Sequence, residues 1–268
     1  MTSRTAVAFP GQGIQFPGMA AQIKNTPAWE LFSEASAVLD CDLGQLCLSG
    51  PAEQLHHPVY GQAAVYVTCL ALWQLHGQRF PAVKVFLGHS LGLIAALTAA
   101  GAISFPQGVQ LVKRRGELMG EMRGGGMLAV LGLRTGIVRQ LCTQVEDGFV
   151  AVAGENSPGH TVVSGDGQGL QRLAVLAQER GAKRVVALKA PGPFHSELMR
   201  PAAERFAEAV EALELNDLRT PVLSCDGQTL LQEQDEVKRE LVNQLTRSVR
   251  FRDAVHTLAA LGIEELAE

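Results

Sequence analysis

The chain lacks a long apolar run and an excess of basic residues. It carries 23 Lys and Arg against 27 Asp and Glu, a formal net charge of −4. General nucleic-acid binding needs a basic face, so this balance argues against it. No window approaches the 18 uninterrupted apolar residues of a membrane span, and residues 1–5 do not begin a signal peptide. We therefore expect a cytoplasmic protein with no membrane and no nucleic-acid partner.

Cysteine is scarce, and its spacing holds no metal-binding pattern. The five cysteines form an odd number without a C-x-x-C pair, as is typical of reduced thiols. We expect no metal site, no cofactor and a monomer. Hydrophobic residues at 47% and charged residues at 19% describe an ordinary globular protein, and 268 residues suffice for one large domain or a large and a small one.

The most informative segment is Gly88-His89-Ser90-Leu91-Gly92. It follows a run rich in Val, Phe and Leu at 82–87 and precedes a small-residue apolar segment at 93–100 that is typical of a helix. Strand, G-x-S-x-G and helix form the context of a nucleophile elbow, in which a tight turn holds the serine hydroxyl above the sheet. The pentapeptide alone is weak evidence, and a structural turn is the alternative. Its context favours a nucleophilic Ser90.

The pattern of predicted strands and helices changes near residue 126. Residues 127–133, 149–154, 161–164 and 184–188 resemble strands, with helices at 135–145 and 169–180. The order βαββαβ predicts a ferredoxin-like unit. The triple glycine at 124–126 predicts a hinge before it, and Pro191-Gly192-Pro193 ends it. We expect a ferredoxin-like small domain at 126–194 inserted into a larger α/β domain formed by 1–125 and 195–268.

The larger domain is expected to begin with a strand at 5–9 that ends in the glycine-rich turn 10–13, whose backbone N–H groups are left free. Residues 62–75 are so apolar that they predict a helix buried on most sides. Further elements are predicted at 106–122, 199–213, 236–245 and 252–261 (helices) and at 221–225 (strand).

A serine hydroxyl needs a neighbouring base to become a nucleophile. Among seven histidines, His195 is the best candidate, because it follows the 191–194 loop at a domain junction, where clefts form. A structural histidine is the alternative. The group that orients the base stays open: Asp226 is the best carboxylate, but it also suits a turn, and a backbone carbonyl would serve equally.

Arg115 ends a run of three cations, Lys113-Arg114-Arg115, in the predicted helix 106–122. Solvated cations on a helix face are the simple interpretation. Arg115 lies about 100° further round the helix than Arg114, which brings it toward the apolar side. An arginine there would present a bidentate fork to a carboxylate substrate. The two interpretations have equal support from the residues alone.

Several motifs occur in an order that resembles one enzyme family. They are Phe9-Pro10-Gly11-Gln12-Gly13, Gly88-His89-Ser90-Leu91-Gly92, Arg115-Gly116, Gly126-Met127-Leu128-Ala129, Asn156-Ser157-Pro158-Gly159, Pro193-Phe194-His195-Ser196 and Gln244 before Val249-Arg250-Phe251. Together they resemble the malonyl-CoA:acyl-carrier-protein transacylases, which include the acyltransferases of polyketide synthases. The resemblance covers nearly the whole chain.

The resemblance implies an α/β-hydrolase-like large domain with the ferredoxin-like insert, and a role for each matched residue. Ser90 would be acylated by malonyl-CoA, and His195 would be its base and later the base for the thiol of an acyl carrier protein. The N–H groups of Gln12 and Leu91 would form the oxyanion hole. Arg115 would bind the malonyl carboxylate. The carbonyl of Gln244 would orient His195, in place of Asp226.

Specificity and reaction type follow from the same resemblance. A bulky Phe194 beside the histidine favours malonyl over methylmalonyl, a preference of about 1–3 kcal/mol per methyl group. The main alternative is an acyl hydrolase of the same fold that clears carrier proteins; such relatives tend to lack the arginine. An acidic carrier would also need a basic patch, for which Lys183, Arg184 and Lys189 are candidates beside the run at 113–114. Ordinary solvated cations are an equally supported interpretation of these residues. The family's asparagine after the late strand is replaced here by Cys225-Asp226.

Overall fold

The computed structural model describes residues 4–268 and contains two β-sheets. The first has the order β8-β7-β2-β1-β9. Its strands β1 (Thr5–Phe9), β2 (Val83–Gly88), β7 (Val222–Leu223) and β9 (Glu265–Ala267) are parallel, and β8 (Leu230–Leu231) is antiparallel to β7. The carboxyl ends of β1 and β2 therefore lie at the same edge, with Phe9 paired to Gly88.

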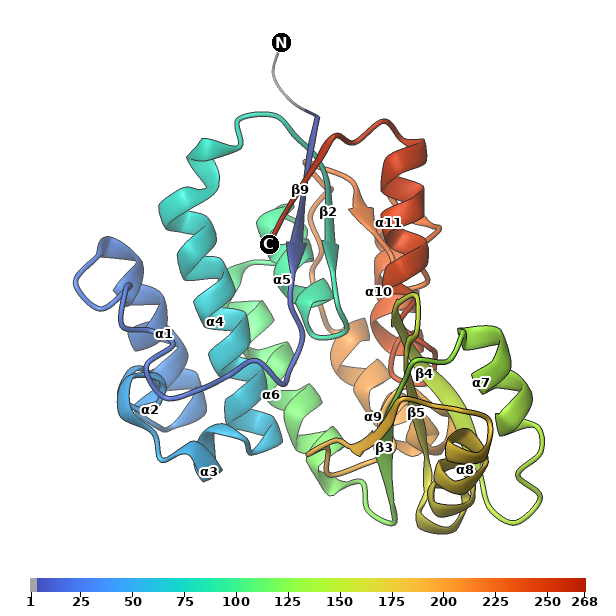
Figure 1. Ribbon diagram of the computed structural model, residues 1–268. Coiled ribbons are helices and arrows are strands. Elements are labelled where there is room, and N and C mark those ends of the chain that lie inside the picture. The colour runs from blue at the N-terminus through green and yellow to red at the C-terminus, as the bar shows by residue number, and fades with distance from the viewer. Residues whose placement is uncertain (1–3) are drawn as a thin grey trace.

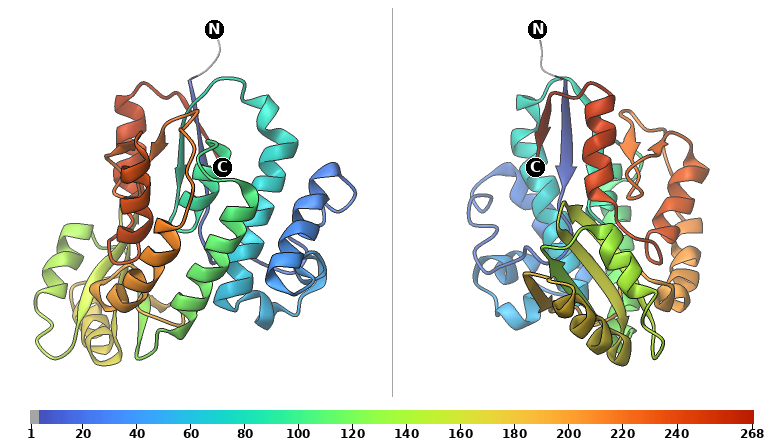
Figure 2. Two further views of the ribbon diagram at one scale, coloured as in Figure 1. Left: turned by 180° about the vertical axis from the view of Figure 1, so that it is seen from behind. Right: turned by 45° about the vertical axis from the view of Figure 1, so that its right-hand side comes forward.

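Both faces of the first sheet are covered by helices, which explains why all five residues of β1 are buried. Alternate residues point to opposite faces. Val7 and Phe9 pack against the core formed with α4 (Pro58–His76), α5 (Gly92–Ala99) and α6 (Phe105–Glu121). Ala6 and Ala8 instead meet α11 (Phe251–Ala260). The views in Figures 1 and 2 show these helices on the two sides of the sheet.

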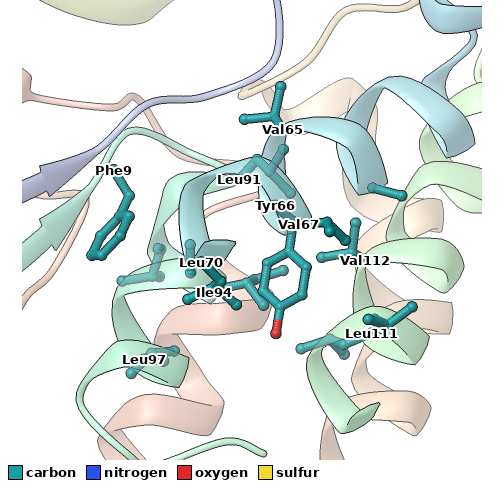
Figure 3. Close-up of a cluster of buried hydrophobic side chains, with 14 of the residues drawn as sticks. Phe9, Val65, Tyr66, Val67, Leu70, Leu91, Ile94, Leu97, Leu111 and Val112 are labelled. Carbon is teal, nitrogen blue, oxygen red and sulfur yellow. The ribbon is translucent and has the colours of Figure 1, made fainter. Parts of the chain in front are cut away.

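The main core lies between β1, α4, α5 and α6 (Figure 3). Helix α4 buries residues on most of its circumference, as its composition predicts. The one phenol in this cluster, that of Tyr66, lies 3.0 Å from Thr98 Oγ1 and so remains hydrogen-bonded. This packing fixes α5 and α6 behind the end of β2.

The remaining helices surround this core. In chain order they are η1 (Pro27–Trp29), α1 (Glu30–Leu39), α2 (Leu43–Ser49), α3 (Ala52–Leu55), η2 (Gly77–Arg79), η3 (Glu197–Met199), α9 (Arg200–Glu211) and α10 (Gln234–Asn243). Helices α1 to α3 and strand β9 were not predicted. The strand predicted at 221–225 forms only the two residues of β7, because Asp226 turns the chain toward β8. Among the described residues, no helix is both long and apolar enough to cross a bilayer.

The second sheet confirms the predicted βαββαβ unit. Its elements are β3 (Gly125–Leu131), α7 (Thr135–Cys142), β4 (Val150–Ser157), β5 (His160–Asp166), α8 (Gly167–Glu179) and β6 (Arg184–Ala187). The antiparallel order β4-β5-β3-β6 is that of a ferredoxin-like fold. In Figures 1 and 2 this unit lies at the end of the molecule where β1 and β2 finish. The predicted α/β fold class is confirmed.

The glycines at 124–126 differ from the prediction. Gly125 and Gly126 belong to β3 and pair with Asp166 and Gly165, so two of the three expected hinge residues are fixed in a sheet. A Cβ on Gly125 would lie 2.6 Å from the Gly165 carbonyl oxygen, so close packing explains the glycine there. Gly124, at φ +81°, is left as the turn.

The two units, one built around each sheet, are joined by the backbone and ionic contacts described next, which we call the seam. Gly154 of β4 forms a parallel bridge with Val249, just before α11. Beside it, the buried carboxylate of Glu155 pairs with Arg252 at 2.9 Å and with Arg139 of α7. Arginines from both units therefore meet one carboxylate, which stabilises their relative position. The exact domain boundaries stay a prediction.

Candidate active site

The segment 88–92 forms a sharp turn between β2 and α5. Ser90 has a left-handed backbone with φ +56°. A Cβ on Gly88 would come within 2.0 Å of the Gly92 backbone, and one on Gly92 within 1.9 Å of the Phe9 carbonyl oxygen. Both glycines are thus required by close backbone contact. The strained geometry directs the buried Ser90 hydroxyl toward the cavity at the start of α5, as expected for a nucleophile elbow.

The structure brings His195 to Ser90 across 105 residues of sequence. Ser90 Oγ lies 2.7 Å from His195 Nε2. On the other side of the ring, His195 Nδ1 lies 2.7 Å from the Gln244 carbonyl oxygen and 3.2 Å from that of Arg247. Carbonyl oxygens only accept, so Nδ1 carries the proton and Nε2 is free to accept the serine proton. His195 lies in the loop just before η3, which starts two residues later.

His195 is held in its neutral form. Burial, followed by the positive charge of Arg115, lowers its pKa to about 3, although the two carbonyl oxygens favour the protonated ring. At neutral pH the imidazole is therefore uncharged, with its proton on Nδ1 and Nε2 free to act as a general base.

Arg115 is buried beside the serine, so it is not a solvated cation on a helix face. Its side chain is 1% exposed on α6. Nη2 donates to Ser90 Oγ at 2.9 Å and to Gln244 Oε1 at 3.3 Å, and Nη1 donates to Gln62 Oε1 at 2.7 Å. Burial lowers the pKa of Arg115 to about 10, so the guanidinium still carries its charge at neutral pH. No carboxylate of the described chain forms an ion pair with it.

The resemblance assigns the oxyanion hole to the backbone N–H groups of Gln12 and Leu91. Gln12 lines the cavity in front of Ser90, and Leu91 precedes the first turn of α5. The two segments are joined by a 2.9 Å hydrogen bond from the His89 N–H to the Phe9 carbonyl. Within residues 4–268, neither the Gln12 nor the Leu91 N–H has a hydrogen-bond acceptor. Both remain free to bind an anionic oxygen.

A cavity of about 550 Å³ opens above Ser90 between the two sheets. Its walls come from both units and combine apolar side chains with polar and charged ones. Phe194 and Met119 line it near Ser90, and Met127 and Val162 come from the second sheet. The Ser164 hydroxyl donates to the Phe194 carbonyl and so fixes the loop that carries Phe194 and His195. The cavity has the size of a site for a small acyl group with part of its carrier.

Asp226 does not take part in this arrangement. Its carboxylate accepts from the N–H groups of Gln228 and Thr229 at 2.7 and 2.9 Å and closes the β7–β8 turn. Neighbouring Cys225 is buried, and its Sγ lies 3.5 Å from the Gly88 carbonyl oxygen. Burial raises the pKa of this thiol, so it stays protonated beneath the elbow. The residue that replaces the family's asparagine therefore packs against the end of β2.

Two contacts near the site were not predicted. Gln62 is buried in α4 and holds Arg115. Asn156 Oδ1 lies 3.0 Å from His89 Nε2, which ties β4 to the elbow. A glutamine at the start of a buried apolar helix is the signal that could have singled out Gln62, because a buried amide needs a polar partner. Residues 4–268 hold no cluster of three or more His, Cys, Asp or Glu side chains suited to a metal ion.

Comparisons with known proteins agree with this geometry. A family model described as an acyl transferase domain matches residues 7–267. The malonyl CoA-acyl carrier protein transacylase of Bacillus subtilis is 38% identical over 99% of this chain and 86% of that protein. A solved malonyl-CoA:acyl carrier protein transacylase from Xanthomonas oryzae superposes with a TM-score of 0.95 at 36% identity, covering 100% of this chain and 88% of that one.

A third match is a solved complex. It holds a type II polyketide synthase acyl-carrier protein with its malonyl-transacylase. The TM-score is 0.95 at 34% identity, and the match covers 98% of this chain and 88% of that one.

Proposed function

Because the chain belongs to the acyl transferase family, we propose that it moves a malonyl group from CoA to the phosphopantetheine thiol of an acyl carrier protein through an acyl-Ser90 ester. The single observation that carries this proposal is the buried, unpaired guanidinium of Arg115, 2.9 Å from Ser90 Oγ. A cation at this depth supplies what a substrate with its own carboxylate needs.

In the first half-reaction Ser90 Oγ attacks the thioester carbonyl of malonyl-CoA. His195 Nε2 takes the hydroxyl proton across the 2.7 Å hydrogen bond, while the Gln244 carbonyl holds the ring by its Nδ1–H. The N–H groups of Gln12 and Leu91 stabilise the anionic carbonyl oxygen. The carbon–sulfur bond then breaks, and the proton on Nε2 passes to the departing CoA sulfur.

The second half-reaction reverses these steps with a different thiol. His195 removes the proton from the carrier's phosphopantetheine thiol, and the resulting thiolate attacks the acyl-Ser90 carbonyl. The ester bond breaks, and Ser90 regains its proton from Nε2. Since His195 acts as a base at the start of each half-reaction, it must be neutral at both of those points, which its lowered pKa supports.

Arg115 and Phe194 select the acyl group in this proposal. The guanidinium binds the malonyl carboxylate through two N–H groups, which Lys could not do with the same geometry. Phe194 is buried in the cavity wall, where an added methyl group on the substrate would crowd its ring. Lys189 also lines the cavity and is the one candidate of the predicted basic patch that does so. Its ammonium group could therefore contact a phosphate of CoA or of the carrier protein's phosphopantetheine.

The test is mass spectrometry of the intact protein exposed to malonyl-CoA and acetyl-CoA, with and without a holo acyl carrier protein. Malonyl-CoA alone should add one malonyl group to Ser90, and the carrier should remove it and gain the same mass. Ser90→Ala is the matched control and should acquire no adduct. Rapid release of free acid with no malonyl-carrier formed would instead make the protein an acyl hydrolase and overturn the proposal.

We also propose that the enzyme acts as a cytoplasmic monomer. The five cysteines, all of which are free thiols in the structure, support the compartment. Light scattering coupled to size exclusion measures the mass in solution, and a mass twice that of the chain would contradict the monomer.

A further inference from the structure

Gln62 is one of the polar residues that hydrogen-bond to Arg115, and it has no part in the reaction steps described above. It is fully buried in α4, and its Oε1 accepts from Arg115 Nη1 at 2.7 Å. The amide is oriented by its other end, where Nε2 lies 3.4 Å from the sulfur of Met119, on the same helix face as Arg115 and one turn further along α6. Gln62 therefore presents its oxygen, and not its N–H groups, to the guanidinium.

The partners of Arg115 are all uncharged. Besides Gln62 they are Ser90 Oγ and the Oε1 of Gln244, and Nε has no hydrogen-bond partner among the described residues. A buried arginine is ordinarily paired with a carboxylate, because an isolated buried charge is costly. Elsewhere in this chain the rule holds: the buried Glu155 is surrounded by arginines. Here amide oxygens position the guanidinium without cancelling its charge.

We infer that Gln62 is a specificity-determining positioning residue: its neutral amide keeps Arg115 in place and uncompensated, so that the carboxylate of the acyl group supplies the missing negative charge. The inference rests on the proposed function and adds to it the residue that leaves the charge of Arg115 available to the substrate. A glutamate at the same position would supply that charge from within the protein and compete with the substrate.

Gln244 belongs to the same arrangement. Its side-chain oxygen accepts from Arg115 at 3.3 Å, and its main-chain oxygen accepts from His195 at 2.7 Å. One residue thus contacts both the cation and the base. A shift of Arg115 toward an internal carboxylate at position 62 would move the cation away from Ser90 without removing any group that carries out the chemistry.

The decisive variant is Gln62→Glu, with Gln62→Met as a second variant that removes the acceptor but adds no charge. For Gln62→Glu, kcat/KM for malonyl transfer should fall roughly 100-fold, mostly through KM, while Ser90 acylation by acetyl-CoA is kept. The malonyl-to-acetyl ratio should therefore collapse. For Gln62→Met we expect a smaller loss of about tenfold, because the charge stays but the guanidinium is less well held. Gln45→Glu, on the exposed face of α2, adds the same charge away from the site and should change neither rate.

Three outcomes overturn the inference. The first is an unchanged malonyl-to-acetyl ratio in Gln62→Glu. The second is a parallel loss of both substrates in Gln62→Met, which would mark a merely structural role. The third is a Gln62→Glu protein that fails to fold together with a Gln62→Met protein of wild-type selectivity. A wild-type protein that transfers no malonyl group would instead refute the proposed function, so the two failures are distinguishable.

Discussion

Ser90 and His195 share more than their 2.7 Å hydrogen bond: both have left-handed backbones, with φ +56° and +60°. Only one other residue with a side chain, Asp40, has a positive φ in the described chain. Such backbones cost about 1–2 kcal/mol each in a residue with a Cβ. The reacting pair therefore lies where the fold accepts local strain in order to direct two side chains at each other.

Relief of this strain is measurable at position 90. Ser90→Gly and Ser90→Ala both remove the hydroxyl and should abolish acylation, but only glycine adopts the left-handed backbone without cost. Chemical denaturation should show a free energy of unfolding about 1 kcal/mol higher for Ser90→Gly than for Ser90→Ala. Equal values, or a less stable glycine variant, would show that the turn stores no such strain.

The lowered pKa of His195 predicts an unusual pH profile. A base works when neutral, so a pKa of about 3 keeps it active as the pH falls well below the ordinary histidine value of about 6.5. The rate of Ser90 acylation, measured by rapid quench with malonyl-CoA, should show no inflection between about pH 8 and pH 5. Such an inflection near pH 6.5 would contradict the buried, neutral histidine.

The same profile tests the influence of Arg115. Burial is the largest cause of the low pKa and the arginine charge is the second. In Arg115→Met, assayed with acetyl-CoA, the acid limb should therefore move toward higher pH than in the wild type. If the rate falls at the same acidic pH in both proteins, burial alone sets the pKa of His195.

Replacement of Arg115 should change what is transferred. In Arg115→Ala we expect kcat/KM for malonyl-CoA to fall about 100- to 1000-fold, because the carboxylate is left buried and unpaired, while acetyl transfer or hydrolysis gains in relative rate. Arg115→Lys keeps the charge but loses the fork and should be intermediate. Unchanged selectivity in Arg115→Ala would remove this residue from the substrate site.

Phe194 should limit the size of the acyl group. In Phe194→Ala the discrimination against methylmalonyl-CoA should weaken by about 1–3 kcal/mol, which corresponds to roughly 5- to 150-fold in the ratio of kcat/KM values. Competition assays with both CoA esters measure the ratio directly. Val162→Ala enlarges another wall of the cavity and serves as the control. An equal change in both variants would mean that cavity volume, and not the Phe194 ring, sets the preference.

The seam between the two sheets should contribute stability through Glu155. Its carboxylate is 1% exposed and faces arginines of both units, so Glu155→Ala should lower the free energy of unfolding by about 2 kcal/mol. Glu121 pairs with Arg205 at half-exposed positions, so Glu121→Ala should change it by less than about 1 kcal/mol. Comparable losses in the two variants would contradict a special role for the seam.

The local sequence was enough to predict the features of this protein that depend on residues close together in the chain. The elbow at 88–92 was predictable because its two glycines must accept backbone atoms at close range. The βαββαβ order was predictable because strand and helix periods alternate within 125–187. The glycines at 125 and 126 were wrongly assigned to a hinge because the strand with which they pair, β5, lies about 40 residues further along the chain.

Only the tertiary structure decided which distant side chains meet. The residues left Arg115 equally suited to solvent or interior, and they left the group orienting His195 open, since a carbonyl oxygen carries no signature in the sequence. Packing of α6 against α4 placed Arg115 beside Gln62, and the loop after α10 brought the Gln244 carbonyl to the histidine. The physical reason is that helical periodicity predicts which face is buried, whereas the partner on that face depends on how separate elements pack.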